Sequence, residues 1–148
     1  MVNQKEDNFS LSVFLYVFNK DMNKVLLIKR NKEKRKKWGF DWGTIGGKVE
    51  PEELLVEAGI REAKEEIGIN LNHKRLKFLF FEERPSKVHT PAVHFFYYLI
   101  LDEKTKITIN QESDEYKWFD LNNLPKKMVD SKEKVLKIFD LANKNVAH

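Results

Sequence analysis

The chain has 148 residues and a formal net charge of +4, and 41% of its residues are hydrophobic while 34% are charged. This length fits one domain spanning residues 1–148, with enough apolar residues for a core and no apolar run long enough to cross a bilayer. The sequence has no cysteine, which excludes disulfides, zinc–thiolate sites and cysteine nucleophiles, and we expect a cytoplasmic protein with no membrane association.

The N-terminal part begins with two predicted strands. Residues 9–18 alternate between polar and apolar before becoming fully apolar, residues 25–28 form a second apolar run, and the turn between them favours a hairpin. Residues 30–37 contain six basic residues in eight and are predicted to form a loop. Four of the six glycines follow between residues 39 and 47, where the backbone must bend tightly or approach another group closely.

A helix of about four turns is predicted after the glycines. Pro51 suits its first turn, Glu52 and Glu53 place negative charge at its positive end, and Gly68 suits the position just past its last residue.

Strands and a last helix are predicted for the remainder of the chain. Aromatic and β-branched residues indicate strands at residues 75–81, 93–101, 106–109 and 116–119. Asp130 and Glu133 then predict a capping box for a helix that ends near Asn143. This order of elements favours an α/β fold with a mixed β-sheet between helices.

Three carboxylates converge on the mid-chain helix. Glu62, Glu65 and Glu66 lie within an arc of about 100° on one turn, and a separate apolar stripe between residues 56 and 67 is predicted to face the core. Like charges at this spacing destabilise a helix, and carboxylate oxygen is the preferred ligand of Mg²⁺ and Mn²⁺. The cluster predicts a divalent metal site, with a solvated glutamate-rich surface helix as the alternative.

The spacing around this cluster resembles a known family. Gly47, Glu53 and the run from Arg61 to Ile69 match all nine specified positions of the 23-residue Nudix box. The preceding strands, the glycine loop and the later strand and helix also resemble the Nudix α/β/α sandwich. The chain departs from the familiar pattern twice, because Ile45 stands where proline is common and Glu52 stands where glycine is common.

The resemblance implies an Mg²⁺-dependent hydrolase in which water attacks phosphorus and displaces a nucleoside phosphate or a phosphate group. It implies that the glutamates at 62, 65 and 66 bind the metal or act as base, with Glu62 and Glu65 as competing candidates for the base. It also implies that the Gly46 carbonyl is a metal ligand and that Arg61 and Glu53 have supporting roles.

A further acidic ligand is expected from the segment before the last strand. Residues 111–115 offer Glu112 and Glu115 as candidates, and an exposed polar turn is the alternative.

Three residues are candidates for substrate binding. Arg30 ends the second strand, where many family members place a phosphate-contacting arginine. Trp42, together with Trp38 and Phe40, flanks the glycines and is a candidate for stacking on a base, although such aromatic residues more often belong to a core. Asp130 follows a segment similar to that of the nucleotide-sanitising, mutator-protein-like Nudix enzymes, in which a nearby Asn or Asp reads the purine edge.

The leading hypothesis for the reaction is hydrolysis of a (d)NTP, including an oxidised one, to a nucleoside monophosphate and pyrophosphate. The alternative substrate is ADP-ribose or another nucleoside diphosphate derivative, which Pro85 favours because many ADP-ribose hydrolases of the family carry a proline nearby. A third reading is a catalytically silent domain that binds nucleotide, or binds nucleic acid through residues 30–37. Catalytically silent members of the family usually lack some of the glutamates of the Nudix box, whereas this chain has all of them. Nucleic acid is therefore not an expected partner. The oligomeric state and the number of metals stay open.

Overall fold

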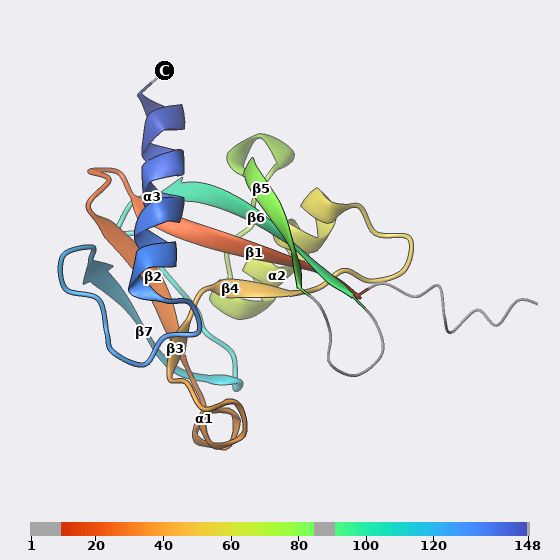
Figure 1. The fold of residues 1–148 in the computed structure, drawn as a ribbon, viewed down its shortest axis with the longest axis horizontal. Coiled ribbons are helices and arrows are strands. Elements are labelled where there is room, and N and C mark those ends of the chain that lie inside the picture. The colour runs from red at the N-terminus through yellow and green to blue at the C-terminus, as the bar shows by residue number, and fades with distance from the viewer. Residues whose placement is uncertain (1–9, 85–90, 148) are drawn as a thin grey trace, which may run out of the picture.

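The fold is described from a computed structural model, which describes residues 10–84 and 91–147 (Figure 1). Pro85, one of the substrate clues, lies outside the described residues, as does residue 9, the expected start of the first strand.

The described residues form one seven-stranded sheet, three α-helices and a short 3-10 helix at His73–Arg75. The strands are β1 (Ser10–Asn19), β2 (Lys24–Arg30), β3 (Trp42–Gly43), β4 (Ile45–Lys48), β5 (Lys77–Arg84), β6 (Ala92–Leu101) and β7 (Ser113–Asp120). The helices are α1 (Lys32–Trp38), α2 (Leu55–Ile67) and α3 (Lys132–Val146).

The sheet splits into two branches at β1, one that contains β2 and one that contains β4. Along the main path the strand order is β3-β2-β1-β6-β5, where β1 and β6 are parallel and the other neighbours are antiparallel. The N-terminal half of β1 pairs with β4, as in Phe14 with Gly46, whereas its C-terminal half pairs with β2, as in Val17 with Leu26. Strand β7 extends the β2 branch. The ends of β2 and β4 therefore lie on different branches of the sheet, and residues of both strands line one cleft.

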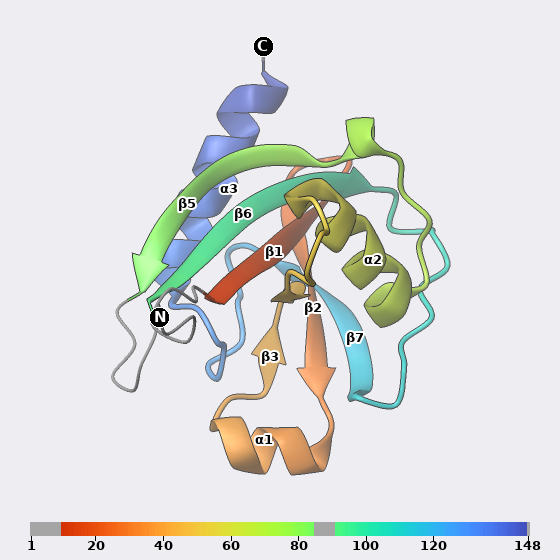
Figure 2. The same cartoon turned by 90° about the vertical axis from the view of Figure 1, so that its right-hand side faces the viewer.

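Two hydrophobic clusters fill the space on either side of the sheet. Alternate residues of β1 point to opposite faces. Leu15 packs with Ile67 of α2 in one cluster, whereas Phe18 packs with Ile138 of α3 in the other. Figure 2 shows α2 in front of the sheet and α3 behind it. The predicted α/β/α sandwich with a mixed sheet between helices is confirmed.

The predicted loop at residues 30–37 is wrong, because most of it forms α1. Asn31 caps the helix by accepting a hydrogen bond from the Lys34 N–H, and Gly39 ends it in the left-handed conformation at φ 80°. These local signals, an Asn before the basic run and a Gly after it, are typical of helix ends.

The predicted helix boundaries also needed correction. Helix α2 begins at Leu55 instead of Pro51, because Glu52 turns the chain with φ 66° and the Glu53 side chain accepts a hydrogen bond from the Glu50 N–H. Its end at Gly68, at φ 69°, is confirmed.

In the C-terminal part, residues 106–109 are not a strand. Ile107 is buried and the Thr108 N–H bonds to the Ile67 carbonyl, so this segment packs against the end of α2 without joining the sheet. Helix α3 is capped by Ser131, whose hydroxyl accepts from the Lys134 N–H, and not by Asp130.

Candidate active site

Helix α2 places two of its three central glutamates, Glu62 and Glu66, against the glycines of β4. The side chains of Glu62 and Glu66 are buried, with residue exposures of 8% and 5%, whereas the Glu65 side chain is 53% exposed. The predicted apolar stripe packs in the core cluster, and Glu62 and Glu66 lie off it, buried between α2 and β4. They are buried because β4 offers backbone without side chains at Gly46 and Gly47.

The two glycines leave no room for a side chain. A Cβ on Gly47 would lie 2.2 Å from Glu62 Oε1, and a Cβ on Gly46 would lie 2.4 Å from the Val13 carbonyl oxygen of β1. The close approach predicted for the glycine segment is thus an approach of α2 to β4, with the Glu62 carboxylate in contact with the strand.

Glu66 is held from two sides. One carboxylate oxygen accepts a hydrogen bond from the Gly46 N–H at 2.8 Å, and the other accepts from Arg30 Nη1 at 2.8 Å. Arg30 also donates to the Thr44 carbonyl at 3.3 Å. The structure thus places Arg30 in the cleft beside a carboxylate, and its predicted contact with a phosphate stays a prediction.

Arg61 connects four groups around the cluster. It donates to both oxygens of Glu53, at 2.8 and 3.0 Å, and to Glu62 at 3.0 Å, Glu65 at 3.3 Å and the Lys48 carbonyl at 2.9 Å. The hydrogen bond with Glu53 raises the pKa of Arg61 and lowers the pKa of Glu53. Arg61 therefore lies between Glu53 and two glutamates of α2, and the supporting roles expected of Arg61 and Glu53 stay predictions.

The pKa of Glu62 is shifted strongly. Burial and, next, the negative charge of nearby Glu66 together raise the pKa of Glu62 to about 7, against the opposing effect of Arg61. Two buried carboxyl groups that lie close enough for the charge of one to raise the pKa of the other favour either a shared proton or a bound cation. The oxygen donors of Glu62, Glu65 and Glu66 are of the kind that a hard divalent cation takes. Among the described residues, no group of three or more acidic or histidine side chains is arranged to hold a metal ion. Arg30 donates a hydrogen bond to the Glu66 carboxylate and Arg61 donates one to the Glu62 carboxylate.

A cleft of about 650 Å³ contains the cluster. Its lining joins the three glutamates of α2 to residues from both branches of the sheet, from α1 and from the segments before and after β7. They are Ser12, Phe14, Arg30, Lys34, Trp38, Phe40, Gly46, Gly47, Lys48, Glu62, Glu65, Glu66, Glu112 and Val129. Acidic, basic and aromatic side chains therefore share one space of the size that small-molecule sites have.

The two acidic candidates before the last strand separate in the structure. Glu112 lines the cleft and its carboxylate lies 3.2 Å from Lys34 Nζ. Glu115 is exposed on β7, where it pairs with Lys29, and is not part of the cleft lining. Their positions differ because the segment before β7 faces α1, whereas Glu115 already belongs to a strand.

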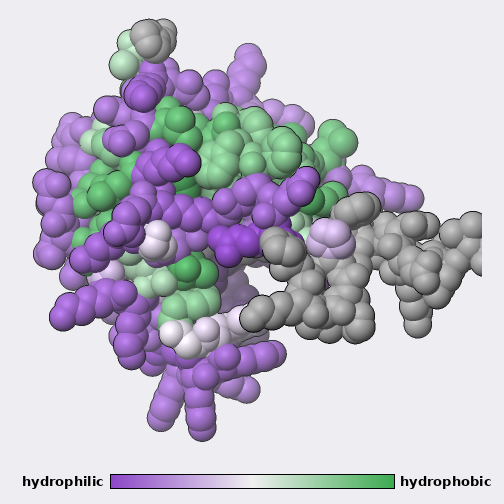
Figure 3. Space-filling view, in the orientation of Figure 1, coloured by the Kyte–Doolittle hydropathy of each residue, from purple (hydrophilic) through white to green (hydrophobic). Residues whose placement is uncertain are grey.

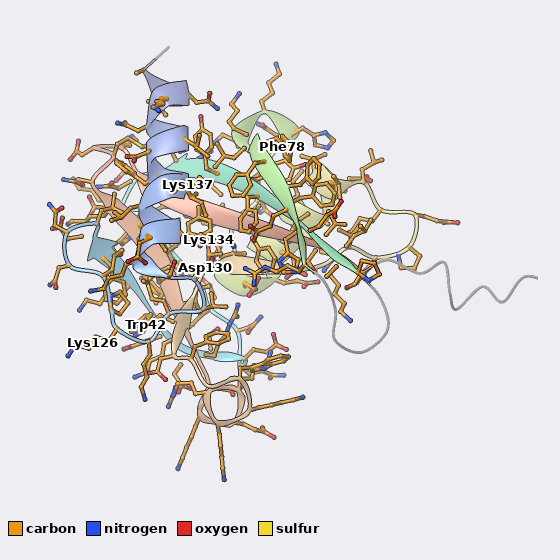
Figure 4. All side chains as sticks on the ribbon, in the orientation of Figure 1. Trp42, Phe78, Lys126, Asp130, Lys134 and Lys137 are labelled. Carbon is orange, nitrogen blue, oxygen red and sulfur yellow. The ribbon has the colours of Figure 1, made fainter. Side chains whose placement is uncertain are left out.

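Trp42 and Asp130 also lie outside the cleft lining (Figure 4). The Trp42 ring packs edge-on against Phe119, at 4.8 Å between centroids, as part of the cluster under α3. Asp130 accepts a hydrogen bond from the Tyr16 hydroxyl and lies 3.4 Å from Lys134 Nζ. The aromatic residues that do line the cleft are Phe14, Trp38 and Phe40.

Sequence reasoning missed some of the lining residues. Phe14 and Lys48 belong to strands, where nothing in the local pattern distinguishes a cleft residue from a core or surface residue. Lys48 carried one usable signal, since it directly follows the glycine pair. Val129 carried none, because its segment reaches the cleft through the pairing of Trp42 with Met128.

Comparison with known proteins supports the resemblance. The NUDIX domain model matches residues 8–139. The chain belongs to the Nudix family. It is 35% identical over 122 residues to an ADP-ribose pyrophosphatase of Methanocaldococcus jannaschii, which covers 82% of this chain and 68% of that protein. It is 33% identical over 105 residues to an 8-oxo-dGTP diphosphatase of Buchnera aphidicola, covering 67% of this chain and 75% of the relative. The chain is a Nudix hydrolase.

Solved structures of the family share the fold. The MutT NUDIX hydrolase from Burkholderia pseudomallei superposes with a TM-score of 0.71 at 23% identity, covering 88% of this chain and 97% of that one. The MutT protein from Methanosarcina mazei Go1 also gives 0.71 at 23% identity, covering 92% and 96%. At this identity the likeness supports the architecture alone.

Within residues 10–84 and 91–147, none of the helices has the length and apolar character needed to cross a membrane. Hydrophobic side chains that reach the surface gather beside α3 over β5 and include Phe78, which is 47% exposed (Figure 3). The expected cytoplasmic location stays a prediction.

Proposed function

We propose that the chain hydrolyses a phosphoanhydride bond in a nucleoside diphosphate derivative and releases a nucleoside monophosphate. The observation that carries the proposal is the cleft itself, where the buried carboxyls of Glu62 and Glu66 lie beside the exposed Glu65. Lys34 and Lys48 line the same cleft and supply positive charge for a phosphate chain. An all-acidic cleft would repel phosphate, so the mixture of charges is what supports this substrate class.

The residues that would hold Mg²⁺, with Mn²⁺ as a substitute, are the three glutamates of α2 and the backbone carbonyl of Gly46. The raised pKa of Glu62, caused by burial and by the charge of Glu66, supports this assignment, and so does the close approach of the Glu62 carboxylate to Gly47 beside Gly46. When bound, the ion lowers the pKa of water and neutralises phosphate charge. Glu112 is a further ligand candidate within the cleft, whereas Glu115 is not proposed.

We assign the proton acceptor to Glu65. A general base must reach the attacking water, and the Glu65 carboxylate is the most exposed of the three. Glu62, the competing candidate, is buried and has a pKa of about 7, which suits a group that gives up its proton when a cation binds. Arg61, which bonds to both, is proposed to fix their positions.

Two substrates satisfy this proposal, and we propose an order for them from the similarity of the relatives. The match to the ADP-ribose pyrophosphatase is longer and more identical than the match to the 8-oxo-dGTP diphosphatase, so ADP-ribose takes first place, ahead of the (d)NTP expected first from the sequence. Both contain the same nucleoside diphosphate core, which is the part that the cleft is proposed to bind.

The test is a nucleotide panel with Mg²⁺, including ADP-ribose, the dNTPs and 8-oxo-dGTP, with the products identified by chromatography. Glu65→Gln is expected to reduce kcat by about 10²- to 10⁴-fold, which is the range for a general base. Glu115→Gln is the matched control, since it removes an equal charge outside the cleft, and its kcat should stay within about twofold. If no member of the panel yields a nucleoside monophosphate, the proposal fails.

A further inference from the structure

Helix α1 contributes nothing to either core. It has seven residues and none of them is buried. Isolated helices of this length are marginal in water, because helix formation begins with an unfavourable nucleus. In Figure 1, α1 lies beyond the ends of β2 and β3, away from both α2 and α3. Packing therefore does not explain why this helix exists.

Polar contacts hold α1 in place at the cleft instead. Arg35 donates to the Arg30 carbonyl at 2.5 Å and to Asp114 at 2.6 Å, which ties the helix to β2 and to the beginning of β7. Lys34 forms its ion pair with Glu112 across the same gap, and the Asn31 side chain donates to the Gln111 carbonyl at 3.1 Å. A helix with capped ends and four such contacts to its surroundings is fixed in position even without buried residues.

The last residue of α1 presents a large apolar surface to the cleft. Trp38 is 59% exposed, although tryptophan usually buries most of its area, and it lines the cleft beside Phe40. Lys37 Nζ lies 5.3 Å from the centroid of the Trp38 ring. In the part of the chain that the structure describes, no other aromatic ring stacks on Trp38. The indole is therefore exposed on a helix that is held in place, with Lys37 near the ring and no aromatic ring stacked on it among the described residues.

We propose that Trp38 is the stacking platform for the nucleobase of the substrate and that α1 exists to hold it there. The glutamates and lysines of the cleft bind the phosphate chain, so an aromatic surface in the same space receives the other end of a nucleotide. Every nucleobase has a planar face, and stacking on an aromatic side chain does not require a particular base. This assignment rests on the proposed function for the nucleotide class of ligand, and it makes Trp38 a residue for affinity and not for chemistry.

The test measures binding with probes that cannot be hydrolysed. One probe is ADP-ribose with a methylene group in place of the bridging oxygen, and the second is methylenediphosphonate, which has no base. Calorimetry should show that Trp38→Ala weakens binding of the ADP-ribose analogue by about 5- to 150-fold, the range for loss of one stacked base. Its affinity for methylenediphosphonate should stay within about twofold, because that probe does not reach the indole. Trp38→Phe, which keeps a ring, should recover most of the loss.

Three outcomes would overturn the platform: an unchanged affinity of Trp38→Ala for the ADP-ribose analogue, an equal loss for both probes, or no binding of the analogue to the wild-type protein. Folding is not a confounding factor, because Trp38 lies outside both hydrophobic clusters, and urea unfolding should confirm equal stability. Failure of the proposed function is distinguishable, since a protein that binds the analogue through Trp38 but hydrolyses no nucleotide keeps the platform and loses the reaction.

Discussion

Replacing Gly47 by alanine is expected to weaken metal binding with little effect on folding. The new Cβ would lie 2.2 Å from Glu62 Oε1 and 2.7 Å from its Cδ, so the carboxylate must move. A carboxylate is the free end of a flexible side chain, and turning it off its rotamer costs about 0.5–1.5 kcal/mol. The alanine also restricts the unfolded chain, which offsets about 0.4–1 kcal/mol. The net change in the free energy of unfolding should therefore be about 1 kcal/mol or less.

The effect on the cation should be much larger. Displacing or reorienting groups around a metal site typically reduces affinity by about 10- to 100-fold. Gly46→Ala is the comparison for stability alone, because the Gly46 carbonyl is itself a proposed ligand. Its Cβ would meet the Val13 carbonyl oxygen at 2.4 Å, and the backbone of β1 cannot turn aside as a side chain can. That variant should lose about 1–3 kcal/mol of stability or more, as overpacked sites do.

Two measurements separate the variants. Mg²⁺ titration calorimetry gives the affinity, and urea unfolding of the metal-free proteins gives the free energy of unfolding. Gly47→Ala with wild-type Mg²⁺ affinity would refute the assignment of Glu62 as a ligand. Gly47→Ala with a larger loss of stability than Gly46→Ala would refute the reasoning from side-chain flexibility.

Three further predictions concern pH and local structure. Burial and the charge of Glu66 raise the pKa of Glu62 to about 7, so below that pH a proton competes with the cation. The Mg²⁺ affinity should therefore rise by roughly tenfold between about pH 6 and pH 8. Titration calorimetry that gives equal affinities at these two pH values would contradict this. Glu52→Gly should raise the free energy of unfolding by up to about 1 kcal/mol, because Glu52 has φ 66°, and a urea midpoint that falls would show that this backbone is not strained. Ser131→Ala should lower the free energy of unfolding by about 1 kcal/mol through loss of the α3 cap, whereas Glu133→Ala should change it by much less; equal losses would restore the predicted capping box.

Local signals predicted the parts of the fold that depend on neighbours in the sequence. The strand at β1 and the end of α2 at Gly68 follow from local side-chain pattern and backbone preference, and the structure agrees, although Ser12 is buried and Leu11 is exposed, the reverse of a polar face turned to solvent. The three carboxylates of one helical turn line the same cleft. Local signals are also present for α1, in Asn31 and Gly39. The run of basic residues between them predicts a loop by charge alone, but the capping residues at both ends favour a helix, and the structure follows the caps.

The sequence by itself determined the family and the chemical character of the site, because the spacing of Gly47, Glu53 and the Glu62–Glu66 cluster depends only on chain order. Only the tertiary structure decided which groups share the cleft. The burial of Glu62 depends on how closely α2 approaches β4, and the choice of Glu112 over Glu115 depends on where β7 begins beside α1. The position of α1, which carries Trp38, likewise involves a contact between Arg35 and Asp114, which are far apart in the chain. Such long-range distances follow from sheet pairing and packing, which no local pattern records.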